Sequence, residues 1–126
     1  MKLVIPKGCD NAPRKQIVID FTVAIYKKQI EVIKEYADES IMLYQLKENK
    51  KIEGQSFFIA TLQANTDTIE SLEIDQVITH GKFASIHGVL SLKNGETVDF
   101  CDVYTFSNTA KTGKVKEIKS YKIWRK

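Results

Sequence analysis

One acidic residue, Asp102, lies inside an aromatic and β-branched stretch of sequence, FCDVYTF over residues 100–106. The stretch has no Gly or Pro, which predicts a strand. Side chains alternate across a strand, so Asp102 would share one face with Phe100, Tyr104 and Phe106. Burying an unpaired carboxylate costs several kcal/mol unless it is hydrogen-bonded or protonated. We therefore expect Asp102 to occupy a polar spot in a cavity or to have a committed partner.

The order of the elements around this strand predicts a single α+β domain over residues 1–126. Residues 1–12 are expected to be an N-terminal lead-in in which Asp10 or Asn11 caps the first helix. The helical patterns cover 13–28, 30–36 and 55–64. The strand patterns cover 41–46, 69–80, 83–92, 97–106 and 115–124, with an Asn94-Gly95 hairpin signal. Helices laid on one face of a curved antiparallel or mixed sheet satisfy this order.

Composition excludes several classes of function. The 126 residues carry a formal net charge of only +3, without the dense basic stripe of a nucleic-acid binder. No apolar run is long enough for a signal peptide or a membrane helix, and a cytoplasmic location is expected. Cys9 and Cys101 lack metal-ligand spacing and favour a reducing compartment. With two histidines in unlike surroundings, we expect no metal site and no cofactor.

Several segments resemble the nuclear transport factor two-like superfamily, also called SnoaL-like or ketosteroid-isomerase-like. They are YADE at 36–39, KIEG at 51–54, ITHGK at 78–82, DVYTF at 102–106 and GKV at 113–115. The resemblance covers nearly the whole chain from Ala12 and is nearest to small bacterial members of unknown function. It implies a cystatin-like cone, in which helices and a bent sheet enclose a ligand-binding pocket. Members include isomerases, dehydratases, cyclases and accessory subunits.

The resemblance does not extend to the steroid isomerase mechanism. Those enzymes combine a carboxylate base, a tyrosine on the first helix and a protonated second carboxylate. Asp102 matches the second carboxylate, but the base position falls at or near Tyr44 and the helix tyrosine position at Phe21. A phenol is a poor base at neutral pH. We expect that mechanism to be absent.

His87 is the other candidate for chemistry. The resemblance implies that its face of strand 83–92 looks into the cavity, where His87 could pair with Asp102 and move protons near neutral pH. The alternative is a histidine that fixes Asp102 and catalyses nothing. His80 lies in a turn beside Gly81, where exposure is the default, and is a minor candidate.

The expected ligand-binding residues are Tyr104, Tyr44, Phe58 and Phe100, which could equally fill the core. By the resemblance, Ser120 and Lys122 also face inward. Lys122 could attract an anionic ligand or neutralise Asp102, although a lysine that extends to solvent is the more common outcome.

The opposite sheet face is expected to be apolar and covered by a second copy in a homodimer. The residues expected on that face are Ala84, Ile86, Leu90, Leu92, Cys101 and Val103.

Three functions remain open at this point. The leading hypothesis is a pocket protein that binds a small, largely apolar molecule, with Asp102 orienting the ligand. The first alternative is a lyase or isomerase that uses His87 and Asp102 as an acid–base pair. The second is a protein-interaction module that uses the open sheet face.

Overall fold

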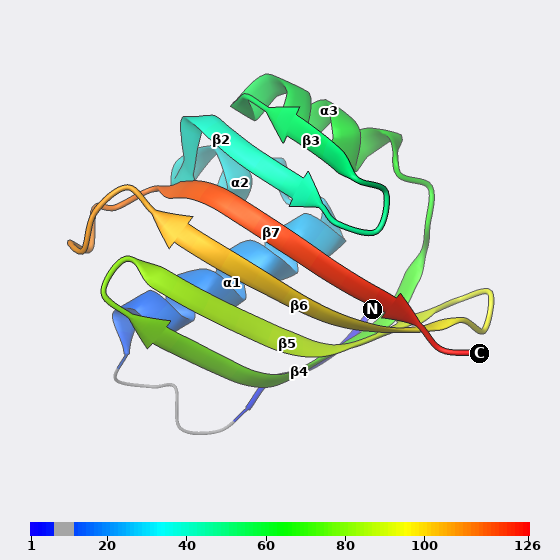
Figure 1. Cartoon of the computed structure of the whole chain (residues 1–126). Coiled ribbons are helices and arrows are strands. Elements are labelled where there is room, and N and C mark those ends of the chain that lie inside the picture. Colours follow the sequence, from blue (N-terminus) through cyan, green and yellow to red (C-terminus); the bar gives the residue numbers. More distant parts are fainter. Residues whose placement is uncertain (7–11) are drawn as a thin grey trace.

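Three helices pack on one side of a seven-stranded mixed sheet in the parts of the chain that the computed structural model describes, residues 1–6 and 12–126 (Figure 1). Cys9 and the expected helix caps Asp10 and Asn11 lie outside the described residues. The sheet is open and bent, and the helices lie behind it in the view of Figure 1. The α+β cone expected from the sequence is confirmed.

The three helices are α1 (Pro13–Lys27), α2 (Ile30–Tyr36) and α3 (Gln55–Ala64). Pro13 occupies the first turn of α1, where a missing N–H costs nothing. The helix ends where Lys28 adopts a left-handed conformation, with φ of 56°. Six of the seven residues from Val18 to Ala24 are buried. Because these residues point to more than one side of the helix, α1 is covered on two sides, as its apolar pattern predicts.

The sheet has the strand order β1-β4-β5-β6-β7-β2-β3. Strands β4 (Ile69–His80), β5 (Phe83–Leu92), β6 (Thr97–Phe106) and β7 (Val115–Trp124) form an antiparallel meander with the predicted bounds. Strand β2 (Ala37–Gln45) runs parallel to β7 and begins four residues before the predicted start at Ile41. Two short strands were not predicted. They are β1 (Lys2–Val4), within the expected lead-in, and β3 (Lys50–Glu53), between the expected strand at 41–46 and the expected helix at 55–64.

The strand register determines which side chains face the helices. Ile86, Asp102 and Ser120 are direct partners across β5, β6 and β7, so they share the inner face. The prediction that Ala84, Ile86, Leu90 and Leu92 lie outside is therefore wrong, because all four are buried in the core.

A bulge in β4 lies between Ile74 and Gln76, opposite Gly88. The strands come so close there that a Cβ on Gly88 would lie 1.9 Å from the carbonyl oxygen of Glu73. Only glycine fits this approach. After the bulge, Val77 points inward and Ile78 outward.

Candidate functional site

A cavity of about 190 Å³ lies between the inner face of the sheet, the C-terminal end of α1 and helix α3. The turn between β2 and β3 and the connection from α3 to β4 both contribute lining residues, and both segments lie on the right in Figure 1. About half of the residues that line it form an apolar wall: Ile25, Leu43, Phe58, Leu62, Ile69, Leu90, Leu92, Val98, Ile118 and Trp124. Such a wall suits an apolar ligand better than a water-filled channel.

Asp102 lies on the wall of this cavity. Its side chain is only 3% exposed, and its Oδ1 atom is buried with no hydrogen-bond partner. Ser120 lies directly opposite on β7, and Lys122 follows two residues further along the same face. A buried acceptor without a partner is rare in folded proteins and calls for an explanation.

Burial raises the pKa of Asp102 from 3.8 to about 6. Desolvation is the largest effect, because a low-dielectric site penalises the charged form. The Lys122 ammonium and the Ser120 hydroxyl each lower the pKa and offset part of that penalty. Near neutral pH the carboxylate is mostly charged, and it can become neutral under mildly acidic conditions.

Tyr26 lines the cavity beside Asp102 and was not among the predicted site residues. Its pKa is raised by burial first, and then by the charges of Asp102 and Tyr104. One turn earlier on α1, Thr22 shares a 2.8 Å hydrogen bond with the Tyr104 hydroxyl. Thr22 and Tyr26 lie four residues apart on α1, so their side chains share the stripe of the helix that faces β6.

Besides Asp102, three lysines and two acids line the cavity. They are Lys28, Lys47, Lys122, Glu48 and Asp67. The Lys28 ammonium donates to the carbonyl oxygen of Asn65. The Lys47 ammonium lies 3.4 Å from the ring centre of Trp124, at the end of β7, and the Lys122 ammonium lies 5.4 Å from that of Tyr26. Within residues 1–6 and 12–126, none of the three lysines forms an ion pair.

The predicted ligand-binding residues divide into three groups. Phe58, Ser120 and Lys122 line the cavity together with Asp102. Phe100 and Tyr104 point to the same side of the sheet but are buried in the core outside the cavity lining. Tyr44 does not face the cavity, because the alternation along β2 points Leu43 and Gln45 inward, and its ring lies 5.8 Å from the Lys51 ammonium.

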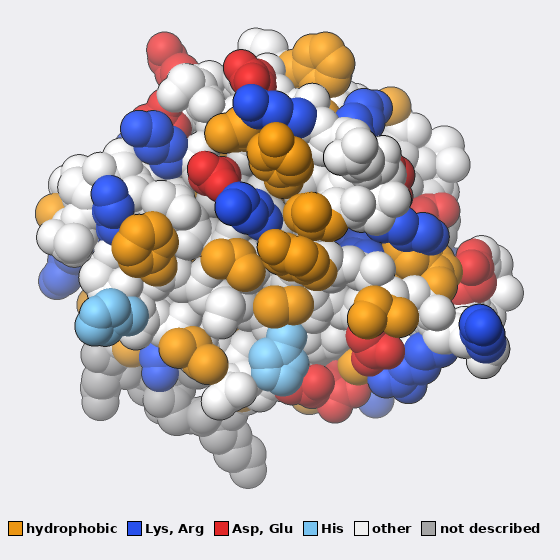
Figure 2. Space-filling model, in the orientation of Figure 1, with side chains coloured by type: hydrophobic (Ala, Val, Ile, Leu, Met, Phe, Trp, Pro, Cys, Tyr) orange, Lys and Arg blue, Asp and Glu red, His pale blue; other side chains and the backbone are white. Residues whose placement is uncertain are grey.

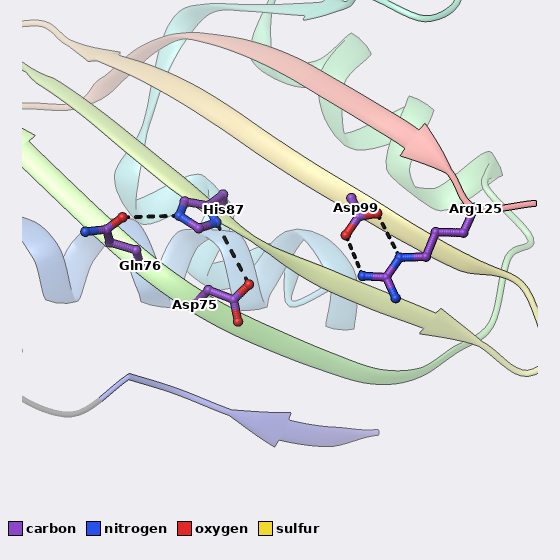
Figure 3. A network of polar contacts seen from close by, with 5 residues as sticks. All are labelled: Asp75, Gln76, His87, Asp99 and Arg125. Carbon is purple, nitrogen blue, oxygen red and sulfur yellow. Dashed lines mark hydrogen bonds and ion pairs between the residues drawn. The ribbon is translucent and has the colours of Figure 1, made fainter.

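The predicted pairing of His87 with Asp102 is wrong. His87 is the cross-strand partner of Cys101, so it points away from Asp102, to the outer face. Figure 3 shows its ring between Gln76, whose Oε1 lies 3.3 Å from Nε2, and Asp75, whose Oδ2 lies 3.9 Å from Nδ1. Asp99 and Arg125 form a second polar contact on this face, at 2.8 Å. His80, at the end of β4, is exposed.

Over the described ranges, no group of three His, Cys, Asp or Glu side chains is arranged to hold a metal ion. None of the helices in those ranges has the length and the apolar character needed to cross a membrane.

The fold recurs among solved structures of low sequence identity. A nuclear transport factor two-like protein of unknown function from Burkholderia xenovorans has a TM-score of 0.75 at 14% identity, over 91% of this chain and 86% of that chain. A candidate SnoaL-like polyketide cyclase from Shewanella denitrificans also has a TM-score of 0.75 at 14% identity, over 90% and 92%. Nuclear transport factor two from Cryptosporidium parvum has a TM-score of 0.69 at 13% identity, over 95% and 99%.

No profile of a known protein family matches the chain, and no curated protein sequence matches it. At these identities the structural similarity establishes architecture. The chain has the nuclear transport factor two-like fold, which is also that of SnoaL-like and ketosteroid-isomerase-like proteins.

Proposed function

We propose that this protein binds a small, largely apolar molecule in the cavity, and that Asp102 orients it. One observation carries the proposal: the Oδ1 atom of Asp102 is buried without a partner in a cavity that also has an apolar wall. A fold selected for stability alone would gain by replacing this carboxylate with an apolar residue. A ligand that donates a hydrogen bond to Oδ1 would supply the missing partner.

The test measures binding of para-cresol, a neutral phenol with one apolar ring, by ligand-observed NMR. We expect saturable binding to the unaltered protein and at least a tenfold loss on Asp102→Asn, since hydrogen bonds to charged groups contribute about 1.5–3 kcal/mol. The matched control is Asp99→Asn, the same change on the same strand but on the outer face, where Asp99 pairs with Arg125. Equal loss in both variants would refute the proposal, and so would the absence of saturable binding by para-cresol and by its charged analogues. If para-cresol binds as expected, mass spectrometry of small molecules retained through native purification is the next step, which identifies the natural ligand.

Proton transfer is a second candidate function, favoured by the pKa of Asp102 near 6. General acids and bases work best when their pKa lies near the operating pH. Because His87 lies on the other face of the sheet, Asp102 would have to act without it. The measurement is deuterium exchange from solvent into the carbon next to the carbonyl of an aryl ketone. Catalysis is supported if the exchange rate exceeds the buffer background, if Asp102→Asn abolishes the excess and if Asp99→Asn retains it. An exchange rate equal to the background would refute catalysis and leave binding as the proposed function.

The outer sheet face is the second surface for which we propose a role, as the contact between two copies of this chain. Figure 2 shows apolar side chains gathered over the middle of this face. The exposed fractions are 51% for Ile78, 51% for Phe83, 36% for Val103, 45% for Tyr121 and 70% for Ile123. Exposed apolar patches of this kind commonly mark interaction sites, and C2 dimers are the commonest assembly.

Analytical ultracentrifugation of the Ile123→Glu variant tests the dimer. In a two-fold contact one substitution acts twice, so we expect dissociation to monomers at micromolar concentration. Phe57→Glu is the control, because Phe57 is 59% exposed on α3, away from this face. A parent protein that sediments as a monomer would overturn the proposal and leave the face free for a different protein.

A further inference from the structure

We infer that the ligand of this cavity is a single-ring or short-chain amphiphile, with a hydrogen-bond donor at its buried end and an anionic group at its exposed end. This inference rests on the proposed binding function and adds the chemical class of the ligand. It combines three observations: the buried Oδ1 atom of Asp102, the volume of the cavity and the charged side chains that line it.

The buried end is defined by Asp102. Its free Oδ1 is an acceptor when the carboxylate is charged, so the matching ligand group is a donor such as a hydroxyl. Tyr26 and Phe58 line the same cavity, and their rings favour a flat apolar body beside that donor. A ligand that lacks the donor would leave Oδ1 buried without a partner, which is the costly arrangement.

The size of the body follows from the volume. The cavity of about 190 Å³ is close to an engineered cavity of about 150 Å³ that binds benzene. Pockets for drug-sized ligands have volumes of about 300–1,000 Å³. One ring, or a chain of similar bulk, therefore fits. A fused four-ring body such as a steroid does not, so the similarity to ketosteroid isomerase-like structures does not extend to their substrates.

The exposed end is defined by the lysines. Successive inward residues on a strand are about 7 Å apart, so Ser120, Lys122 and Trp124 define three successive levels along the cavity. Asp102 lies at the first level, because it is the cross-strand partner of Ser120. Lys122 stands at the second level, and Lys47 stands over Trp124 at the third. Neither lysine forms an ion pair within the described residues. An anionic group at these levels would lie near two cations. It is favoured over an ammonium group because, apart from Asp102, three lysines and two acids line the cavity.

Four probes separate these requirements: para-hydroxyphenylpropionate, phenylpropionate, tyramine and para-cresol. The first carries both the donor and the anion, the second lacks the donor, the third carries an ammonium in place of the carboxylate, and the fourth has no charged group. Titration calorimetry at neutral pH and low salt gives the dissociation constants. We expect para-hydroxyphenylpropionate to bind at least tenfold tighter than phenylpropionate. It should also bind about threefold to fivefold tighter than para-cresol, with tyramine weaker still.

Lys122→Met tests the charged end directly. It should reduce the advantage of para-hydroxyphenylpropionate over para-cresol. That advantage is the ratio of the two dissociation constants in one variant, so the effect of the lost Lys122 charge on Asp102 acts on both probes and cancels. Lys119→Met is the control, because Lys119 lies on the same strand, points outward and pairs with Glu117.

The inference is overturned if para-cresol or tyramine binds at least as tightly as para-hydroxyphenylpropionate, or if Lys122→Met weakens para-cresol and para-hydroxyphenylpropionate equally. Failure of all four probes to bind would instead refute the proposed binding function itself, so the two failures are distinguishable.

Discussion

Asp102→Asn should make the protein more stable at neutral pH, even though it removes the proposed ligand anchor. The fold raises the pKa of this carboxyl from 3.8 to about 6, and one pKa unit corresponds to about 1.4 kcal/mol. Ionised Asp102 therefore destabilises the folded state by about 3 kcal/mol above pH 6. The Asn side chain has nearly the same shape and never ionises. Because its amide donors also have to be accommodated, we expect a net gain of about 1–3 kcal/mol at pH 7.

The gain in stability from Asp102→Asn should depend on pH, in a direction that follows from the raised pKa of Asp102. Between pH 3.8 and about 6 the folded state holds a proton on Asp102 that the unfolded state has released, so stability falls as pH rises through this window. The gain from Asp102→Asn should therefore be largest at pH 7 and nearly vanish by pH 4. Urea unfolding of both proteins at pH 4, 5, 6 and 7 measures it, and the difference at each pH cancels the titration of other groups. A variant that is less stable at pH 7, or a gain that is the same at pH 4 and 7, would refute the reasoning.

Three further substitutions test the packing around the site. Tyr104→Phe leaves the buried Thr22 hydroxyl without its partner and should lower the free energy of unfolding in urea by about 1–3 kcal/mol. Adding Thr22→Val should recover part of that loss. An unchanged or larger loss in the double variant would contradict the pairing. Gly88→Ala would place a Cβ against the Glu73 backbone and should cost at least about 3 kcal/mol; near-neutral stability would mean that the strands separate easily there. Phe58→Ala should cost about 3–5 kcal/mol and enlarge the cavity, and a cost below about 1 kcal/mol would show that Phe58 is poorly packed.

The long meander was predictable because its strands carry strong local signals. Strands β4 to β7 alternate clearly, and Asn94-Gly95 marks the turn between β5 and β6, so their bounds follow from the sequence. The short strands β1 and β3 carry no such pattern. They have three and four residues, include charged side chains, and exist because a neighbouring strand supplies their hydrogen bonds.

The orientation of β5 was harder to predict than its bounds, although the sequence contains the signal. One face of β5 carries Ala84, Ile86, Gly88, Leu90 and Leu92, and it is more apolar than the face that carries His87. A sheet with one covered side buries the more apolar face. The family resemblance indicated the opposite orientation and led to the incorrect pairing of His87 with Asp102.

The candidate site was predictable where strand alternation alone decides it. Asp102, Ser120 and Lys122 share the inner face of two adjacent strands, and the aromatic neighbours of Asp102 indicated burial. Tyr26 was missed because a helix that is apolar on nearly all sides gives no indication of which stripe faces the strands. That information comes from the packing of α1 against the sheet, and local sequence does not contain it.

A carbon-13 NMR titration of the Asp102 carboxyl carbon tests the central claim most directly, because it reports the burial, the charge and the accessibility of this one group. The account predicts a midpoint near pH 6 in the free protein. Saturation with para-hydroxyphenylpropionate should lower that midpoint, because a hydrogen bond donated to the charged form favours it. A midpoint near 3.8 in the free protein would place the carboxylate in water, and a midpoint unaffected by a bound probe would mean that the ligand does not contact Asp102.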